Sequence, residues 1–210
     1  KNADMSHFTP KYNPWDERVC AVPDGDLFKV IRQGKASVVT DHIDTFTKTG
    51  IRLKSGQELQ ADMIITATGL NLQLLGGMKI QVDGKPFEMT ETLNYRGVMF
   101  KDLPNLAMIF GYTNASWTLK ADLSSEYICR LLKHMDKEGL RQCTPRNHDD
   151  SVVDEPFLGL ASGYIQRAKN VLPKQGNKAP WKLYQNYALD LANLRFSKLE
   201  DGAMEFSNPR

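Results

Sequence analysis

The feature that most constrains the fold is a predicted strand, loop and helix in direct succession between Pro104 and Gly139. An apolar strand is expected at 106–110, and a polar loop follows it. Apolar side chains then recur at the spacing of an amphipathic helix, until Gly139 ends the pattern. They are Leu119, Leu123, Ile128, Leu131, Leu132 and Met135. The pattern therefore predicts one strand, loop and helix unit.

The loop of this unit, residues 113–118 with the sequence TNASWT, is the best-placed ligand site in the sequence. It leads into the N-terminus of the predicted helix, where the first backbone N–H groups have no partner within the helix. These groups and the helix dipole favour an anion or a carbonyl oxygen. The residues alone nevertheless favour a plain connection between two packed elements over a ligand site, since many such loops bind nothing.

The N-terminal part of the chain predicts one short helix followed by several short strands. The helix is expected to begin at Asp24 or Asp26, one of which would cap it, and to end at Gly34. A strand at 36–40 follows, and then a run of short strands over 43–66, broken by glycine-containing turns.

The segment ADMIITATGLN, residues 61–71, closes this run of strands. Apolar and β-branched residues favour a strand, and the small residues after them allow a sharp turn or the close approach of a ligand. We therefore expect a buried strand at 62–66 that leads into a functional bend at Ala67, Thr68 and Gly69.

The remaining segments predict a hairpin and two amphipathic helices. Asp83 and Gly84 form a typical hairpin turn in the middle of the segment KIQVDGKPFEM, residues 79–89. Amphipathic stretches at 163–172 and 180–196 flank a basic loop. An aromatic and leucine stripe in the second stretch is more often part of a core than of a cofactor site; it consists of Tyr184, Tyr187, Leu191 and Leu194.

Charge and composition exclude several classes of function. The chain has 27 Lys and Arg against 25 Asp and Glu, and the basic residues are scattered, so nucleic-acid binding is not expected. No apolar stretch approaches the roughly 18 residues that span a bilayer, and the first residues do not resemble a signal peptide. We expect a cytoplasmic location, with peripheral membrane association left open. Cys20, Cys129 and Cys143 share no metal-ligand spacing, so no metal site is expected.

The sequence lacks the common nucleotide-binding motifs, although its small-residue bend would suit a nucleotide-binding α/β protein. It has neither a G-x-G-x-x-G motif after a strand nor a Walker-type loop. Three segments nevertheless resemble the C-terminal portion of the Baeyer-Villiger monooxygenases, which are flavin-dependent enzymes. The segments are HFTPKYNPWDERVCAVPDGDLFKVI, ADMIITATGLN and PNLAMIFGYTNASWTLKADL. The resemblance extends over nearly the whole chain.

The resemblance implies an α/β flavoprotein with two dinucleotide-binding domains, of which this chain holds only parts. Residues 1–68 would be the C-terminal part of the NADPH-binding domain and would end in the strand before the bend. Residues 69–210 would be the C-terminal part of the FAD-binding domain with a helical tail. Because the glycine-rich fingerprints of both domains are absent, we expect a downstream fragment of a longer polypeptide.

The resemblance also assigns a catalytic arginine. Arg18, in NPWDERVC, matches the arginine that stabilises the anions formed during oxygen insertion. A guanidinium suits this role because it stays protonated at any working pH. The usual Lys-Arg pair of the family is Glu17-Arg18 here, so a contribution of a neighbouring lysine to NADPH binding is not expected.

Two segments are assigned to the cofactors by the same resemblance. Ala67, Thr68 and Gly69 would form the passage beside the cofactors, where the chain leaves the NADPH domain. The loop and first helical turn at 114–119 would lie against the flavin ring, which agrees with the physical argument for that loop. The flavin-side candidates in this second segment are Asn114, Ser116, Trp117, Thr118 and Leu119.

The implied activity is that of an FAD- and NADPH-dependent monooxygenase. It would insert one oxygen atom from O2 into ketones to give esters, with oxidation of sulfur in thioamides or sulfides as a second activity. A flavin monooxygenase that oxygenates only nitrogen or sulfur is the nearer alternative. The second alternative is a binding or assembly module without enzymatic activity, if these 210 residues are the whole protein. The isolated fragment is expected to be inactive and need not retain either cofactor.

Overall fold

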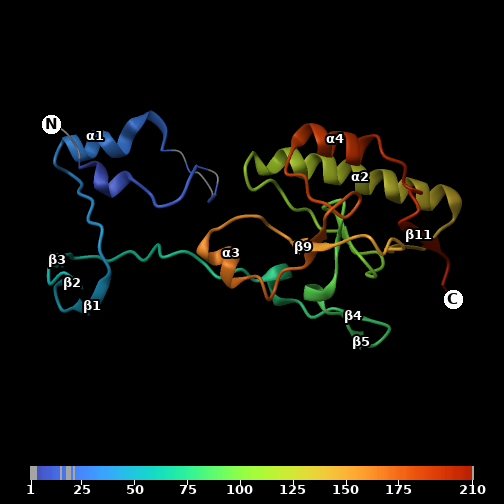
Figure 1. The fold of residues 1–210 in the computed structure, drawn as a ribbon, viewed down its shortest axis with the longest axis horizontal. Helices are drawn as coiled ribbons and strands as arrows, with labels where there is room; N and C mark the ends of the chain where they lie inside the picture. Colours follow the sequence, from blue (N-terminus) through green and yellow to red (C-terminus); the bar gives the residue numbers. More distant parts are fainter. Residues whose placement is uncertain (1–3, 15, 18–19, 21, 210) are drawn as a thin grey trace. The chain divides into compact units, whose positions relative to one another are not determined.

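The structure is a computed structural model that describes residues 4–14, 16–17, 20 and 22–209. The chain divides into two compact units, Lys1–Leu70 and Asn71–Arg210, which are described separately (Figure 1). The assignment of these units to an NADPH-binding and an FAD-binding domain stays a prediction.

The first unit contains short helices and one antiparallel sheet. The helical segments are η1 (Met5–Phe8), η2 (Pro23–Gly25) and α1 (Asp26–Arg32). The sheet has the strand order β1-β2-β3, with β1 at Ile43–Thr47, β2 at Gly50–Leu53 and β3 at Glu58–Gln60. The predicted helix is confirmed, but its N-cap is Gly25, and no aspartate side chain caps it. The predicted run of strands is confirmed as far as Gln60.

Two strands predicted in the first unit are wrong. Residues 36–40 form no strand, and residues 61–70 are exposed and contain no strand. Met63 and Ile65 expose 78% and 81% of their surface. A strand needs a neighbour to pair its backbone N–H and C=O groups, and no strand in the described part of the chain pairs with this segment. The apolar residues that predicted a buried strand therefore lie in an exposed segment that joins no sheet.

The second unit combines two main helices with short antiparallel ribbons (Figure 1). Helix α2 packs against α4. The helices are η3 (Leu74–Gly77), η4 (Met89–Glu91), α2 (Trp117–Glu138), α3 (Gly163–Arg167) and α4 (Tyr187–Arg195). Each ribbon pairs two strands: β4 (Gln81–Val82) with β5 (Lys85–Pro86), β6 (Asn94–Tyr95) with β7 (Met99–Phe100), β8 (Gln142–Pro145) with β11 (Met204–Ser207), and β9 (Asp154–Pro156) with β10 (Lys174–Gly176).

The predicted hairpin and the long helix are confirmed. Asp83 and Gly84 both have positive φ, 51° and 77°, as the tight turn between β4 and β5 requires. Helix α2 ends at Gly139, which adopts the left-handed conformation with φ 64°. None of the helices in the described residues is both long and apolar enough to cross a bilayer.

Three other predictions in this unit need correction. Residues 106–110 form no strand; the Met108 N–H donates to the Val98 carbonyl at 2.7 Å, but no ladder follows. The helix expected over 163–172 is shorter than predicted, because only α3 (Gly163–Arg167) is helical there. The helix expected over 180–196 begins only at Tyr187, because the Asn186 side chain caps it by accepting from the Leu189 N–H at 3.1 Å.

The core of the second unit forms two clusters. The larger lies under α2 and includes Leu93, Tyr95, Val98, Met99, Leu123, Tyr127, Leu131, Met135, Trp181 and Leu194. The smaller lies beside α3 and consists of Phe157, Leu158, Ile165, Ala168, Leu172 and Leu183. A buried network joins distant segments at the larger cluster, where Arg96 contacts Asp201 at 2.6 Å. Burial opposes ionisation of Asp201, but hydrogen bonds from Arg96 and Tyr95 outweigh it and lower the pKa of this carboxyl.

Candidate functional site

The candidate site is the loop that enters α2, and Gln185 holds this loop in place. The Gln185 side-chain carbonyl accepts from the Thr113 backbone N–H at 3.0 Å and from the Thr113 hydroxyl at 3.1 Å. The Asn114 side-chain amide donates to the Gln185 backbone carbonyl at 3.2 Å. The conformation of the loop is therefore fixed by a residue that precedes α4.

The N-terminus of α2 is open to an electron-rich partner. Its N-cap is Ser116, but the side chain of this residue makes no capping hydrogen bond, since its hydroxyl lies 2.9 Å from that of Thr118. The first turn contains no acidic residue. The first N–H groups of a 22-residue helix therefore keep their donor capacity and the positive end of the helix dipole.

Trp117 forms an aromatic wall next to this helix end. Its ring lies against Gly111, where an added Cβ would overlap the indole. The ring centroid is 5.1 Å from that of Phe110, which in turn lies 5.5 Å from that of Phe157. The side chain is nevertheless 46% exposed, so one part of the indole packs and the other faces outward.

A buried ion pair supports the first turns of α2 from below. The Lys120 ammonium lies 2.8 Å from an Asp190 carboxylate oxygen of α4, and the two side chains are only 1% and 2% exposed. The same ammonium lies 5.5 Å from the centroid of the Tyr112 ring. Burial raises the pKa of the Tyr112 phenol above its ordinary value, and Asp190 raises it further. This cluster fixes the helix to α4 directly behind the loop.

The structure brings together one group of the predicted site residues. Asn114, Ser116, Trp117, Thr118 and Leu119 form one exposed surface at the start of α2.

The other predicted site residues lie in the first unit or outside the described residues. Ala67, Thr68 and Gly69 are exposed, and Gly69 has φ 93°. Arg18 lies outside the described residues. Within the described ranges, no three His, Cys, Asp or Glu side chains are close enough together to hold a metal ion.

Sequence reasoning missed the residues that support the loop. Gln185 and Asp190 lie about seventy positions from their partners, and no local motif marks them. Lys120 did carry a signal, because it lies on the same helical face as Leu123 and Tyr127, three and seven positions later. A lysine on an apolar stripe of this kind indicates a buried ionic partner.

Comparison with known proteins identifies the class of protein to which this site is related. Nearly the whole chain is homologous to FAD-containing monooxygenases and corresponds to their C-terminal part. It is 54% identical over 206 residues to the FAD-containing monooxygenase EthA of Mycolicibacterium smegmatis. It is 53% identical over 204 residues to the probable FAD-binding monooxygenase AlmA of Acinetobacter baylyi, and 51% identical over 208 residues to the putative FAD-containing monooxygenase MymA of Mycobacterium tuberculosis.

These matches cover 98%, 97% and 99% of this chain but only 42%, 41% and 42% of the EthA, AlmA and MymA relatives, respectively. The chain therefore spans about two fifths of the length of the curated relatives that it matches. No family model matches the chain, and no solved structure matches it.

Proposed function

We propose that this chain is part of an FAD- and NADPH-dependent Baeyer-Villiger monooxygenase. The overall reaction converts a ketone, O2, NADPH and a proton into an ester, water and NADP⁺. One oxygen atom of O2 enters the bond beside the carbonyl, and the other leaves as water. The homology to FAD-containing monooxygenases supports the flavin; the nicotinamide cofactor and the ketone substrate are the finer parts of the proposal.

The observation that carries the proposal is the open N-terminus of α2. Asn114, Ser116, Thr118 and Leu119 surround backbone N–H groups that lack a side-chain cap and an acidic neighbour. Such a helix end fits the electron-rich edge of a flavin ring. When bound, FAD supplies the redox chemistry that activates O2. The residues of this chain bind and orient the flavin ring of FAD. A helix end without acidic residues favours the reduced, anionic form of that ring.

The other predicted residues complete the proposal. Trp117, packed on one face and exposed on the other, forms a wall for the ring or for the substrate. Ala67, Thr68 and Gly69 supply small side chains where the backbone passes near a cofactor. Arg18 supplies a permanent positive charge for the anions that form during oxygen insertion.

A chimera tests this function directly. In it, this chain replaces the matching 206 residues of the M. smegmatis EthA relative, and the unaltered relative serves as control. We expect a yellow protein with bound FAD that oxidises NADPH and converts a cyclic ketone into a lactone, which mass spectrometry detects as a gain of one oxygen atom.

The other outcomes of this experiment separate the alternatives. Sulfoxide formation from a sulfide without any lactone would replace the proposal with a sulfur-oxygenating enzyme. A folded but colourless chimera, beside a yellow control, would show that this chain does not support flavin binding.

A further inference from the structure

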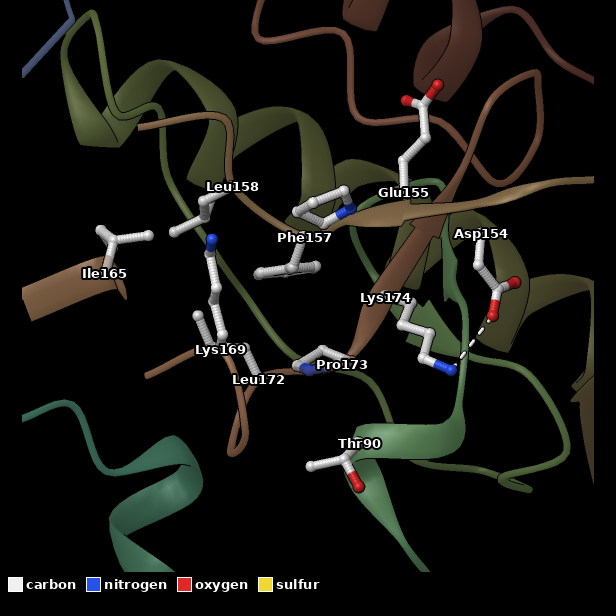
Figure 2. A pocket seen from close by; sticks show the side chains of 11 residues that line it. Thr90, Asp154, Glu155, Phe157, Leu158, Ile165, Lys169, Leu172, Pro173 and Lys174 are labelled. Atoms are coloured by element: carbon white, nitrogen blue, oxygen red, sulfur yellow. Dashed lines mark ion pairs between the residues drawn. The ribbon is translucent and has the colours of Figure 1, made fainter. Parts of the chain in front are cut away.

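We propose that a pocket in the second unit binds a short aliphatic monocarboxylate, independently of the flavin chemistry. The pocket has a volume of about 260 Å³ and lies between the β9–β10 ribbon and α3 (Figure 2). Four core side chains form its apolar lining, and two lysines, Lys169 and Lys174, lie at its edge.

The apolar lining belongs to the folded core, so the pocket exists before a ligand arrives. Phe157, Leu158, Ile165 and Leu172 are only 4%, 8%, 3% and 8% exposed, and all four belong to the smaller core cluster. Their positions are therefore fixed by packing. A preformed apolar cavity of this kind favours a hydrocarbon chain, because little ordering of the protein opposes binding.

Most charged groups around the pocket are already neutralised. Lys174 lies 3.1 Å from Asp154 and 3.4 Å from Glu91. Glu155 lies 3.8 Å from Lys182, and Figure 2 shows its carboxylate directed away from the apolar side chains. Because Lys174 is shared by two carboxylates, these five groups together carry a net charge of −1, and neither Lys174 nor Lys182 is free for a ligand.

Lys169 is different, because among the described residues it makes no ion pair and no hydrogen bond. Its side chain extends along the pocket, with the ammonium end toward Leu158 (Figure 2). The pocket therefore offers an apolar floor and one unpaired cation. A ligand with a hydrocarbon chain and a single negative charge satisfies both.

Size and charge narrow the ligand class further. At about 30 Å³ for each water-sized group, a pocket of about 260 Å³ holds roughly nine such groups. Hexanoate, with six carbons and two oxygens, fits within this volume. A phosphate or a dicarboxylate fits less well, because it needs several donors, whereas the second cation, Lys174, is already shared by Asp154 and Glu91.

The test uses the 210-residue chain and sodium hexanoate, followed by amide chemical shifts in NMR titrations. We expect saturable shifts at Phe157, Ile165 and Leu172. Lys169→Met keeps the apolar stem and removes the charge, so it should weaken hexanoate binding about three- to fivefold, the size of an exposed ion pair. Lys133→Met, an equal change at an exposed position of α2, is the matched control and should bind hexanoate as the unaltered chain does.

Two comparison ligands complete the experiment. Acetate lacks the chain and should bind far more weakly than hexanoate, whereas 1-hexanol lacks the charge and should bind the unaltered chain and Lys169→Met equally. The proposal is overturned if hexanoate shifts no amide around the pocket, or if Lys169→Met binds it as tightly as Lys133→Met does.

Discussion

At the scale of single residues, Gly111 determines where the indole of Trp117 can lie. The ring occupies the space that a Cβ at position 111 would need. This close approach lets Trp117 contact Phe110 while its outer part stays exposed at the helix end. A residue without a side chain is thus required for the aromatic wall of the candidate site.

Gly111→Ala should displace the indole and lower the free energy of unfolding by about 1–3 kcal/mol, because overpacking forces neighbours to move. ¹⁹F NMR of protein labelled with 5-fluorotryptophan should show a shifted Trp117 resonance, assigned with Trp117→Phe. Gly159→Ala is the control, since an added Cβ there meets no atom within 4 Å. An unchanged Trp117 resonance in Gly111→Ala would contradict the packing described here.

A second residue-scale feature is the charge of Lys120, which is buried only because Asp190 lies beside it. Lys120→Met should lower the free energy of unfolding by about 3–5 kcal/mol, since it leaves a carboxylate buried without its partner. Lys120→Met combined with Asp190→Leu should recover most of that loss, because two apolar side chains can replace a buried pair.

Denaturant unfolding followed by tryptophan fluorescence measures these changes, and Lys133→Met, at an exposed position, provides the control. If the double variant loses as much free energy of unfolding as Lys120→Met alone, then the loss in Lys120→Met does not come from an unpaired charge.

At the scale of elements, α2 connects the candidate site to the core. Its N-terminus presents the loop residues, its buried face contacts α4, and Arg195 of α4 forms an ion pair with Glu126 of α2. The position of its first turn is thus set by contacts along much of the helix.

Leu119→Pro should disturb this first turn, because a proline disfavours helical backbone in the residue before it. In the chimera, we expect lower FAD occupancy or slower reduction by NADPH, while circular dichroism shows that the remaining helix persists. Leu119→Ala is the control, because it also removes the leucine side chain but keeps a residue that favours a helix. A difference between the two variants therefore comes from the backbone of the first turn. Wild-type FAD occupancy and reduction rate in Leu119→Pro would mean that the loop is only a connector.

At the scale of the whole molecule, the chain consists of two compact units that meet in sequence at residues 70 and 71. The segment before this division, 61–70, is exposed throughout and carries large apolar side chains. An exposed segment without regular secondary structure is a preferred site of proteolytic cleavage.

Brief digestion of the 210-residue chain with chymotrypsin should therefore cut first within or next to 61–70 and release a stable product close to the second unit. Mass spectrometry identifies the cut, and digestion in urea shows the pattern of the unfolded chain. Early cleavage inside α2, at the same rate as in the segment 61–70, would contradict the division into units.

Local sequence determined the features that local interactions decide. Gly139 ends α2 because a glycine adopts the left-handed conformation without strain, and Asp83-Gly84 forms its turn for the same backbone reason. The spacing of apolar residues located α2, and its open N-terminus follows from the absence of acidic residues in the first turn. The candidate loop at 113–118 was found in this way, from residues adjacent in sequence.

Only the tertiary structure decided the features that depend on distant partners. The apolar residues at 62–66 and 106–110 favour strands, but a strand forms only where a neighbouring strand pairs its backbone in a ladder, and no strand in the described part of the chain does so for either segment. Gln185 and Asp190 act on the site across about seventy positions, so no local pattern could reveal them. Helix ends and turns are set by the energies of neighbouring residues, whereas sheets and buried ion pairs are set by which segments meet in space.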